Sequence, residues 1–90
     1  MRYSISGIMN MNMYGIPMVG ADVCGFFGLK DSEMCGRWMQ LSAFYPFARN
    51  HNNLTYYGNA TQPSEPYALD NGWNETAKHA IYQRYQYLRL

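Results

Sequence analysis

The sequence predicts an α/β protein that is incomplete on its own and has the pattern of part of a (β/α)8 barrel. Local patterns follow one another in the order helix, strand, helix, strand, helix, which is typical of a parallel α/β protein. Both predicted strands are continuously apolar instead of alternating, as expected for strands covered on both faces. The chain has 90 residues. A complete barrel takes roughly 250 residues, so we expect about a third of one.

The expected elements follow from the spacing of apolar residues and from capping and turn residues. In order they are a helix over 3–14, a strand over 17–22, a helix over 32–42, a strand over 46–49, a loop over 52–72 and a helix over 74–90.

The first helix is indicated by apolar residues at helical spacing, namely Ile5, Ile8, Met9 and Met13. Gly15 is a plausible stop, and Pro17 prevents the helix from continuing. The apolar strand that follows starts at this proline, where a missing N–H is tolerated.

Asp31 or Ser32 can cap the second helix. Its apolar stripe consists of Met34, Trp38 and Leu41. Pro46 lies inside the next apolar run, so we expect this strand to begin late, at the proline.

The region 52–72 is rich in Asn, Thr, Gly, Pro and Ser and predicts a long polar loop. Asn74 is a suitable N-cap for the last helix. The expected buried stripe of this helix is Ala77, Ile81, Tyr85 and Leu88.

The composition excludes several functional classes. Seven Lys and Arg residues against six Asp and Glu give no basic patch for nucleic acid, and no apolar run is long enough to span a membrane. The sequence contains no zinc-ligand spacing and no nucleotide-binding motif, so no cofactor is expected. The high aromatic content of 17%, with nine tyrosines, suits either a sugar-binding surface or the interior of a larger protein.

Three Asn-X-Ser/Thr sequons occur, at Asn53, Asn59 and Asn74. Together with an even cysteine count they predict a glycosylated protein of the secretory pathway: extracellular, cell-wall, vacuolar or lysosomal. Any signal peptide would then lie on a part of the chain outside this sequence. Cys24 could be a nucleophile, but Cys35, eleven residues later, offers a disulfide partner.

Side chains at the C-terminal ends of the two strands are the candidates for function, because barrels of this type carry their sites there. Asp22 ends the first strand, and Arg49 and His51 end the second. Asp22 and Arg49 could pair and hold the carboxylate as an acceptor for ligand hydroxyls. Simpler interpretations remain: Asp22 as a turn residue, His51 as a packing residue, and Phe26 as either a sugar-stacking platform or a loop anchor.

Four blocks of the sequence closely resemble glycoside hydrolase family 31, and above all its eukaryotic α-glucosidases. These blocks are 4–8, 14–26, 37–41 and 44–51. The resemblance implies a (β/α)8 catalytic domain, of which this chain covers helix 6 to helix 8.

The resemblance also assigns roles to individual residues. Asp22 and Phe26 match positions lining the −1 sugar subsite. His51 matches a histidine that hydrogen-bonds the −1 sugar, and Arg49 matches its supporting arginine. The family's nucleophile motif, Trp-X-Asp-Met-Asn-Glu, and its acid/base aspartate do not occur in this sequence, so no catalytic residue is expected in this chain.

The same resemblance implies a disulfide between Cys24 and Cys35, matching one in the family's animal members. The implied function is a part of a retaining α-glucosidase that hydrolyses terminal α-linked glucose from oligosaccharides. The implied partners are this substrate and the remainder of the barrel. The alternative is a secreted, non-catalytic carbohydrate-binding or interaction fragment.

Overall fold

The computed structural model describes residues 1–26, 31–51, 55–56, 59–60 and 65–88. Its elements are helix α1 (Arg2–Met13), helix α2 (Ser32–Ser42), strands β1 (Thr55–Tyr56) and β2 (Asn59–Ala60), the 3-10 helix η1 (Pro66–Ala68) and helix α3 (Trp73–Leu88). No helix in this described part of the chain is both long and apolar enough to cross a membrane.

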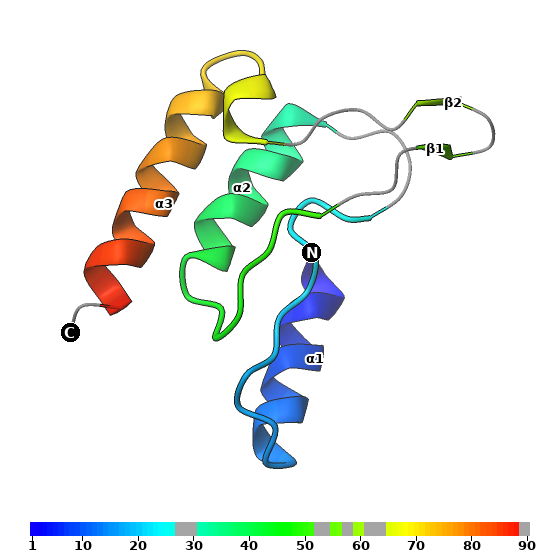
Figure 1. The fold of residues 1–90 in the computed structure, drawn as a ribbon, viewed down its shortest axis with the longest axis vertical. Coiled ribbons are helices and arrows are strands. Elements are labelled where there is room, and N and C mark those ends of the chain that lie inside the picture. Colours follow the sequence, from blue (N-terminus) through cyan, green and yellow to red (C-terminus); the bar gives the residue numbers. More distant parts are fainter. Residues whose placement is uncertain (27–30, 52–54, 57–58, 61–64, 89–90) are drawn as a thin grey trace.

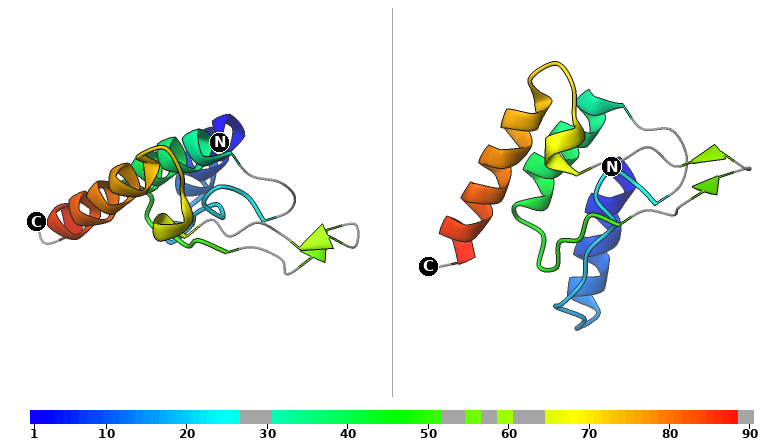
Figure 2. Two further views of the ribbon diagram at one scale, coloured as in Figure 1. Left: turned by 90° about the horizontal axis from the view of Figure 1, so that it is seen from above. Right: turned by 45° about the horizontal axis from the view of Figure 1, so that its top comes forward.

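The helices and the extended segments between them run in opposite directions. Helices α2 and α3 pack side by side, and α1 lies apart from this pair (Figures 1 and 2). In Figure 1 all three helices run downwards, whereas the extended segments 17–22 and 46–49 run back upwards. This is the alternation of a βα repeat, in which helices return the chain so that neighbouring extended segments can be parallel.

Local side chains and turns explain where helices α2 and α3 begin. The Asp31 carboxylate accepts a hydrogen bond of 3.1 Å from the Met34 amide and caps α2. The expected N-cap at Asn74 is wrong, because α3 already begins at Trp73. Asn71 and Gly72, with φ of 56° and 82°, form the turn that precedes α3.

The expected strands over 17–22 and 46–49 are not regular strands. The two segments are joined by one isolated parallel bridge, between Asp22 and Arg49. Backbone bonds run from Phe47 N to the Val19 carbonyl, 3.2 Å, and from Val23 N to the Arg49 carbonyl, 2.9 Å. Within the described residues, each segment has only the other as a hydrogen-bonded strand neighbour. Parallel strands are stabilised inside larger covered sheets, so a single pair forms only a partial ladder.

The region 52–72 contains short elements that the composition does not reveal. Strands β1 and β2 form an antiparallel pair in which Thr55 lies opposite Ala60. Helix η1 follows and carries the chain towards α3 (Figure 1). The expected loop is therefore partly structured.

The core lies between α2, α3 and the two extended segments, and Ile8 of α1 also belongs to it. Its buried residues are Ile8, Val23, Cys24, Cys35, Trp38, Met39, Tyr45, Leu69, Ala77 and Ala80. Gly36 allows the close approach of α2 and α3, because a Cβ at this position would lie 2.5 Å from Cε3 of Trp73.

The apolar faces of α1 and α3 are only partly covered. The expected buried stripe of α3 is wrong beyond Ala77: the exposed fractions are 40% for Ile81, 68% for Tyr85 and 59% for Leu88. On α1, Ile8 is buried but Met13 is 85% exposed. These faces have the periodicity of buried surfaces but find too little cover within the described residues, as expected for part of a larger barrel.

The Gly36 contact can be tested by substitution. We expect Gly36→Ala to lower the free energy of unfolding by up to about 2 kcal/mol. Overpacking against Trp73 costs about 1–3 kcal/mol, whereas the gain in helix propensity is only about 1 kcal/mol. The measurement is urea unfolding of the purified chain with its disulfide intact, followed by circular dichroism.

Gly7→Ala is the matched control, because Gly7 also lies inside a helix but a Cβ there would meet nothing within 4 Å. This variant should gain up to about 1 kcal/mol. Equal stabilisation by both substitutions would show that Gly36 is not needed for the packing of α2 on α3.

Candidate functional site

The candidate site lies where the two extended segments end side by side. Arg49 donates from Nε and Nη2 to Oδ1 of Asp22, at 3.0 and 2.8 Å. The side chains are 52% and 23% exposed, respectively. A pair this exposed adds only about 0.2–1 kcal/mol to stability. Its main consequence is therefore orientation: two donors of Arg49 reach the same oxygen, Oδ1, and hold the carboxylate in one place.

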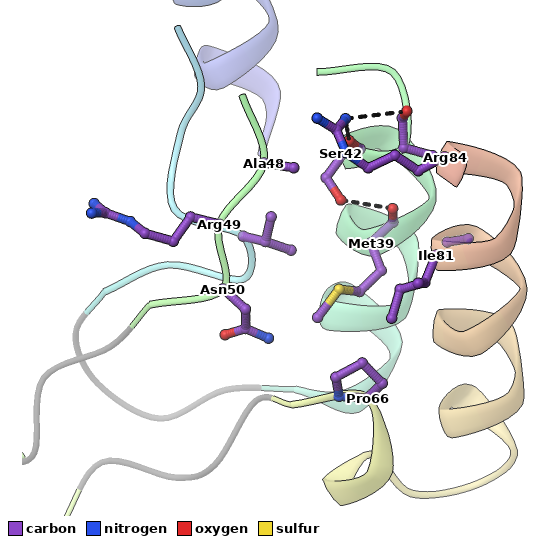
Figure 3. Close-up of a pocket in the computed structure, with 11 residues that line it drawn as sticks. Met39, Ser42, Ala48, Arg49, Asn50, Pro66, Ile81 and Arg84 are labelled. Atoms are coloured by element: carbon purple, nitrogen blue, oxygen red, sulfur yellow. Dashed lines mark hydrogen bonds between the residues drawn. The ribbon is translucent and has the colours of Figure 1, made fainter. Parts of the chain in front are cut away.

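Arg49 lies on the side of its segment that faces away from the helices. Figure 3 shows Ala48 pointing towards α2, whereas the side chain of Arg49 extends in the opposite direction. The guanidinium carbon of Arg49 lies 6.0 Å from the centre of the Phe47 ring, two residues earlier. In an extended segment, residues two apart share a face. The face that carries Phe47 and Arg49 would be the inner face of a barrel whose helices lie outside.

Phe26 and His51 form a second contact between the ends of the two segments. Their ring centres are 5.0 Å apart and the rings are inclined at 35°. A tight turn precedes Phe26, because Cys24 and Gly25 have φ of 71° and 93°, and Gly25 N bonds to the Asp22 carbonyl at 3.2 Å.

A disulfide between Cys24 and Cys35 anchors this turn to helix α2. Both cysteines are almost completely buried. The bond excludes a free thiol at either position, so the interpretation of Cys24 as a nucleophile is wrong.

The structure thus brings the four candidate residues together as two pairs at neighbouring segment ends: Asp22 with Arg49 and Phe26 with His51. Among the sequon residues, Asn74 lies in the first turn of α3 and is half-buried, and Asn59 belongs to β2. Asn53 lies outside the described residues.

Two residues near the site are not among the candidates that the sequence predicts. Arg84 donates from Nη1 to the backbone carbonyl of Tyr45, just before the segment that carries Arg49. Tyr45 belongs to the block 44–51 that carries the family resemblance, whereas Arg84 belongs to none of the four blocks. The only signal for Arg84 is its helical spacing from Ala77 and Ala80, which puts a basic residue on a buried face.

The arrangement suits binding of a polyhydroxylated ligand. An oriented carboxylate accepts hydrogen bonds from hydroxyl groups, and an imidazole both donates and accepts them. The face of an aromatic ring offers apolar contact to a sugar ring. Within the residues that the structure describes, no group of three His, Cys, Asp or Glu side chains is placed to hold a metal ion.

Comparison with known proteins identifies a family over the whole length. Residues 1–90 match the sequence profile described as the glycosyl hydrolases family 31 TIM-barrel domain. The chain is 47% identical to lysosomal acid alpha-glucosidase of Tetrahymena pyriformis, with 99% of this chain and 9% of that protein aligned. It is 50% identical to alpha-glucosidase of Schizosaccharomyces pombe, with 98% of this chain and 8% of that protein aligned.

A solved structure shows the same fold. The glucosidase II alpha subunit in its Glc1Man2-bound form superposes with a TM-score of 0.81 at 35% identity, covering 91% of this chain and 8% of that chain. The chain therefore spans less than a tenth of the length of these relatives.

The disulfide is expected to stabilise the turn that carries Phe26. Replacing both Cys24 and Cys35 with serine should lower the free energy of unfolding by about 3 kcal/mol, because the unfolded chain regains the entropy of an open loop. The measurement is urea unfolding of the variant and of the oxidised chain under identical conditions. A difference below about 0.5 kcal/mol would contradict the anchoring role.

Proposed function

This chain belongs to glycoside hydrolase family 31 as part of its TIM-barrel domain, and on that premise we propose that it supplies sugar-binding residues to a retaining α-glucosidase. The substrate class is an oligosaccharide with a terminal α-linked glucose. The observation that carries the proposal is the Asp22–Arg49 pair, which joins the ends of two parallel segments beside the Phe26–His51 contact.

Each residue of the two pairs has a separate role in the proposed −1 subsite. Asp22 accepts hydrogen bonds from sugar hydroxyls, and Arg49 keeps its carboxylate oriented. His51 bonds a neighbouring hydroxyl, and Phe26 packs against the sugar ring while holding the imidazole in place. Positioning groups of this kind raise the rate by holding the sugar near the geometry of the transition state.

The reacting carboxylates are not among the residues of this site. A retaining glycosidase needs two carboxyl groups about 5–5.5 Å apart, whereas Asp22 is paired with an arginine. Several other carboxylates have structural partners: Asp31 caps α2, Glu33 pairs with Arg37 and Glu75 pairs with Lys78. In the proposed enzyme, the nucleophile attacks the anomeric carbon and forms a glycosyl-enzyme while an acid protonates the leaving oxygen. The same acid, now a base, then takes a proton from water, which attacks the anomeric carbon and releases the nucleophile. Both groups would come from the remainder of the barrel.

We also propose a location in the secretory pathway, with glycans on Asn53, Asn59 or Asn74. The support is the sequon count together with the Cys24–Cys35 disulfide, since such bonds form and persist in oxidising compartments. The similar proteins include lysosomal alpha-glucosidases and the endoplasmic reticulum glucosidase II complex.

One observation favours a second candidate function, a secreted module that binds carbohydrate or another protein without hydrolysing a substrate. The four candidate sugar-binding residues come together as two pairs within this chain alone. The two candidates differ in a measurable way: a binding module would bind a glucoside by itself, whereas a subsite fragment needs the rest of the barrel.

The two functions can be separated by transferring the chain into a relative. We expect the purified 90-residue chain to show no turnover of an α-glucoside. The Schizosaccharomyces pombe alpha-glucosidase, with its matching segment replaced by these 90 residues, should hydrolyse the same substrate. A folded but inactive chimera would refute the subsite proposal, and binding of maltose by the isolated chain would favour the binding module.

Within this chimera, Asp22→Asn should lower kcat/KM by about 10- to 100-fold, because a hydrogen bond to a charged group contributes about 1.5–3 kcal/mol and about 1.4 kcal/mol corresponds to a factor of ten in rate. His51→Ala should lower kcat/KM by about 2- to 10-fold, because a typical hydrogen bond contributes about 0.5–1.5 kcal/mol. The control is His79→Ala, which removes an exposed imidazole from α3. Wild-type kinetics in Asp22→Asn would exclude Asp22 from the subsite.

A further inference from the structure

Arg84 of α3 contacts the connection between α2 and the segment that carries Arg49 and His51 (Figure 3). Its guanidinium donates hydrogen bonds to four backbone carbonyls within residues 42–46. Nη1 lies 3.1 Å from the carbonyl of Ser42, 3.4 Å from that of Ala43 and 2.6 Å from that of Tyr45, and Nη2 lies 3.4 Å from that of Pro46.

The end of α2 explains why an arginine suits this place. The last carbonyls of a helix have no partner within the helix, and the C-terminal end carries partial negative charge. Helix α2 ends at Ser42, with Ala43 as its C-cap. A guanidinium presents five N–H donors in one plane and always carries its charge, so one side chain serves both the helix end and the turn after it.

Tyr45 holds the same connection from the other side. Trp38 Nε1 donates to the Tyr45 hydroxyl at 3.0 Å, and this hydroxyl lies 2.6 Å from Oγ of Ser4. The Ser4 hydroxyl donates to the Met1 carbonyl, so Tyr45 must be the donor to Ser4. Tyr45 is thereby bound to α1 and α2 through its hydroxyl and to α3 through its carbonyl. We call Ser4, Trp38, Tyr45 and Arg84 the Tyr45 clamp.

The clamp lies just before the extended segment and is a firm point of attachment for it. Arg49 follows Tyr45 by four residues. Beyond the clamp, a cavity of about 220 Å³ separates Ala48 and Asn50 from Ile81 and Met39 of the helices (Figure 3). The described backbone bonds of this stretch join it to the first segment, from Phe47 N to the Val19 carbonyl and from Val23 N to the Arg49 carbonyl. The bonds from Arg84 at its start join it to α3.

From this geometry we propose that Arg84 is a positioning residue for the sugar-binding pair. It sets the place at which the segment leaves α2, and it thereby places Arg49, the carboxylate of Asp22 that Arg49 orients, and His51. The inference rests on the proposed subsite function. Arg84 itself lies on the helix side of the segment, whereas the side chain of Arg49 points away from the helices (Figure 3), so Arg84 acts without touching the sugar.

The test compares Arg84→Met and Arg84→Lys in the chimeric alpha-glucosidase. The probe is deoxynojirimycin, a glucose analogue with nitrogen in the ring, and each variant is assayed well below its own Tm. We expect Arg84→Met to lower kcat/KM and to weaken inhibitor binding by about 10- to 100-fold each, because a displacement of about 1 Å at a site can cost a factor of 100. Arg84→Lys keeps the positive charge but lacks the planar guanidinium with its several donors. This variant should therefore restore part of kcat/KM and part of the inhibitor affinity.

Arg37→Met is the matched control, because it removes an arginine that pairs with Glu33 and contacts Trp73 near the same helix pair. Its kinetics should remain within about twofold of the unaltered chimera. A purely structural Arg84 would lower Tm without changing inhibitor binding, and that result would overturn the proposal. If Arg84→Met does not fold, unaltered inhibitor binding in Arg84→Lys overturns it, and a loss supports it. An inactive unaltered chimera would instead refute the proposed function.

Discussion

The backbone hydrogen bond from Val23 to the Arg49 carbonyl, 2.9 Å long, is the constraint on which the candidate site depends. It fixes the parallel register in which Asp22 and Arg49 lie side by side. The same register leaves Phe26 and His51 within contact distance just beyond the two ends. A shift by one residue would turn Arg49 to the face that Ala48 now occupies, towards the helices, and separate it from the carboxylate. The site is thus a consequence of strand pairing, even though the pairing amounts to a single bridge.

Contacts with the helices hold the two segments in that register. The Cys24–Cys35 disulfide fixes the end of the first segment to α2, and the Tyr45 clamp fixes the start of the second. Both attachments join the segments to helices, on the side opposite to that towards which the Arg49 side chain points (Figure 3). Exposed apolar side chains such as Ile81 and Met13 mark where this unit needs further cover. Membership in a TIM-barrel family gives a direct reason for that need, since a barrel surrounds each βα unit with neighbours.

Much of the helical structure and the identity of the family could be predicted from the sequence. Trp38 lies on a periodic apolar stripe and is buried as that stripe requires. Periodicity failed on α3, because it reports which residues are suited to burial but not whether a partner is present to bury Tyr85. The two regular strands expected from continuous apolar runs did not form either, because such a run needs neighbouring strands to make a hydrogen-bonded ladder. The contact between Asp22 and Arg49 was foreseeable from strand ends, but the contacts of Arg84 span 38 to 42 residues and no local pattern encodes them.

The central claim is that these 90 residues place an oriented carboxylate and an imidazole against a terminal glucose. A crystal structure of the chimeric alpha-glucosidase with glucose in its −1 subsite would test that claim most directly. We expect Asp22 and His51 each to lie within about 3.2 Å of a sugar hydroxyl, with Arg49 still bound to Asp22. Glucose bound without contact to either residue, or an Arg49 turned away from Asp22 in the complete barrel, would contradict it.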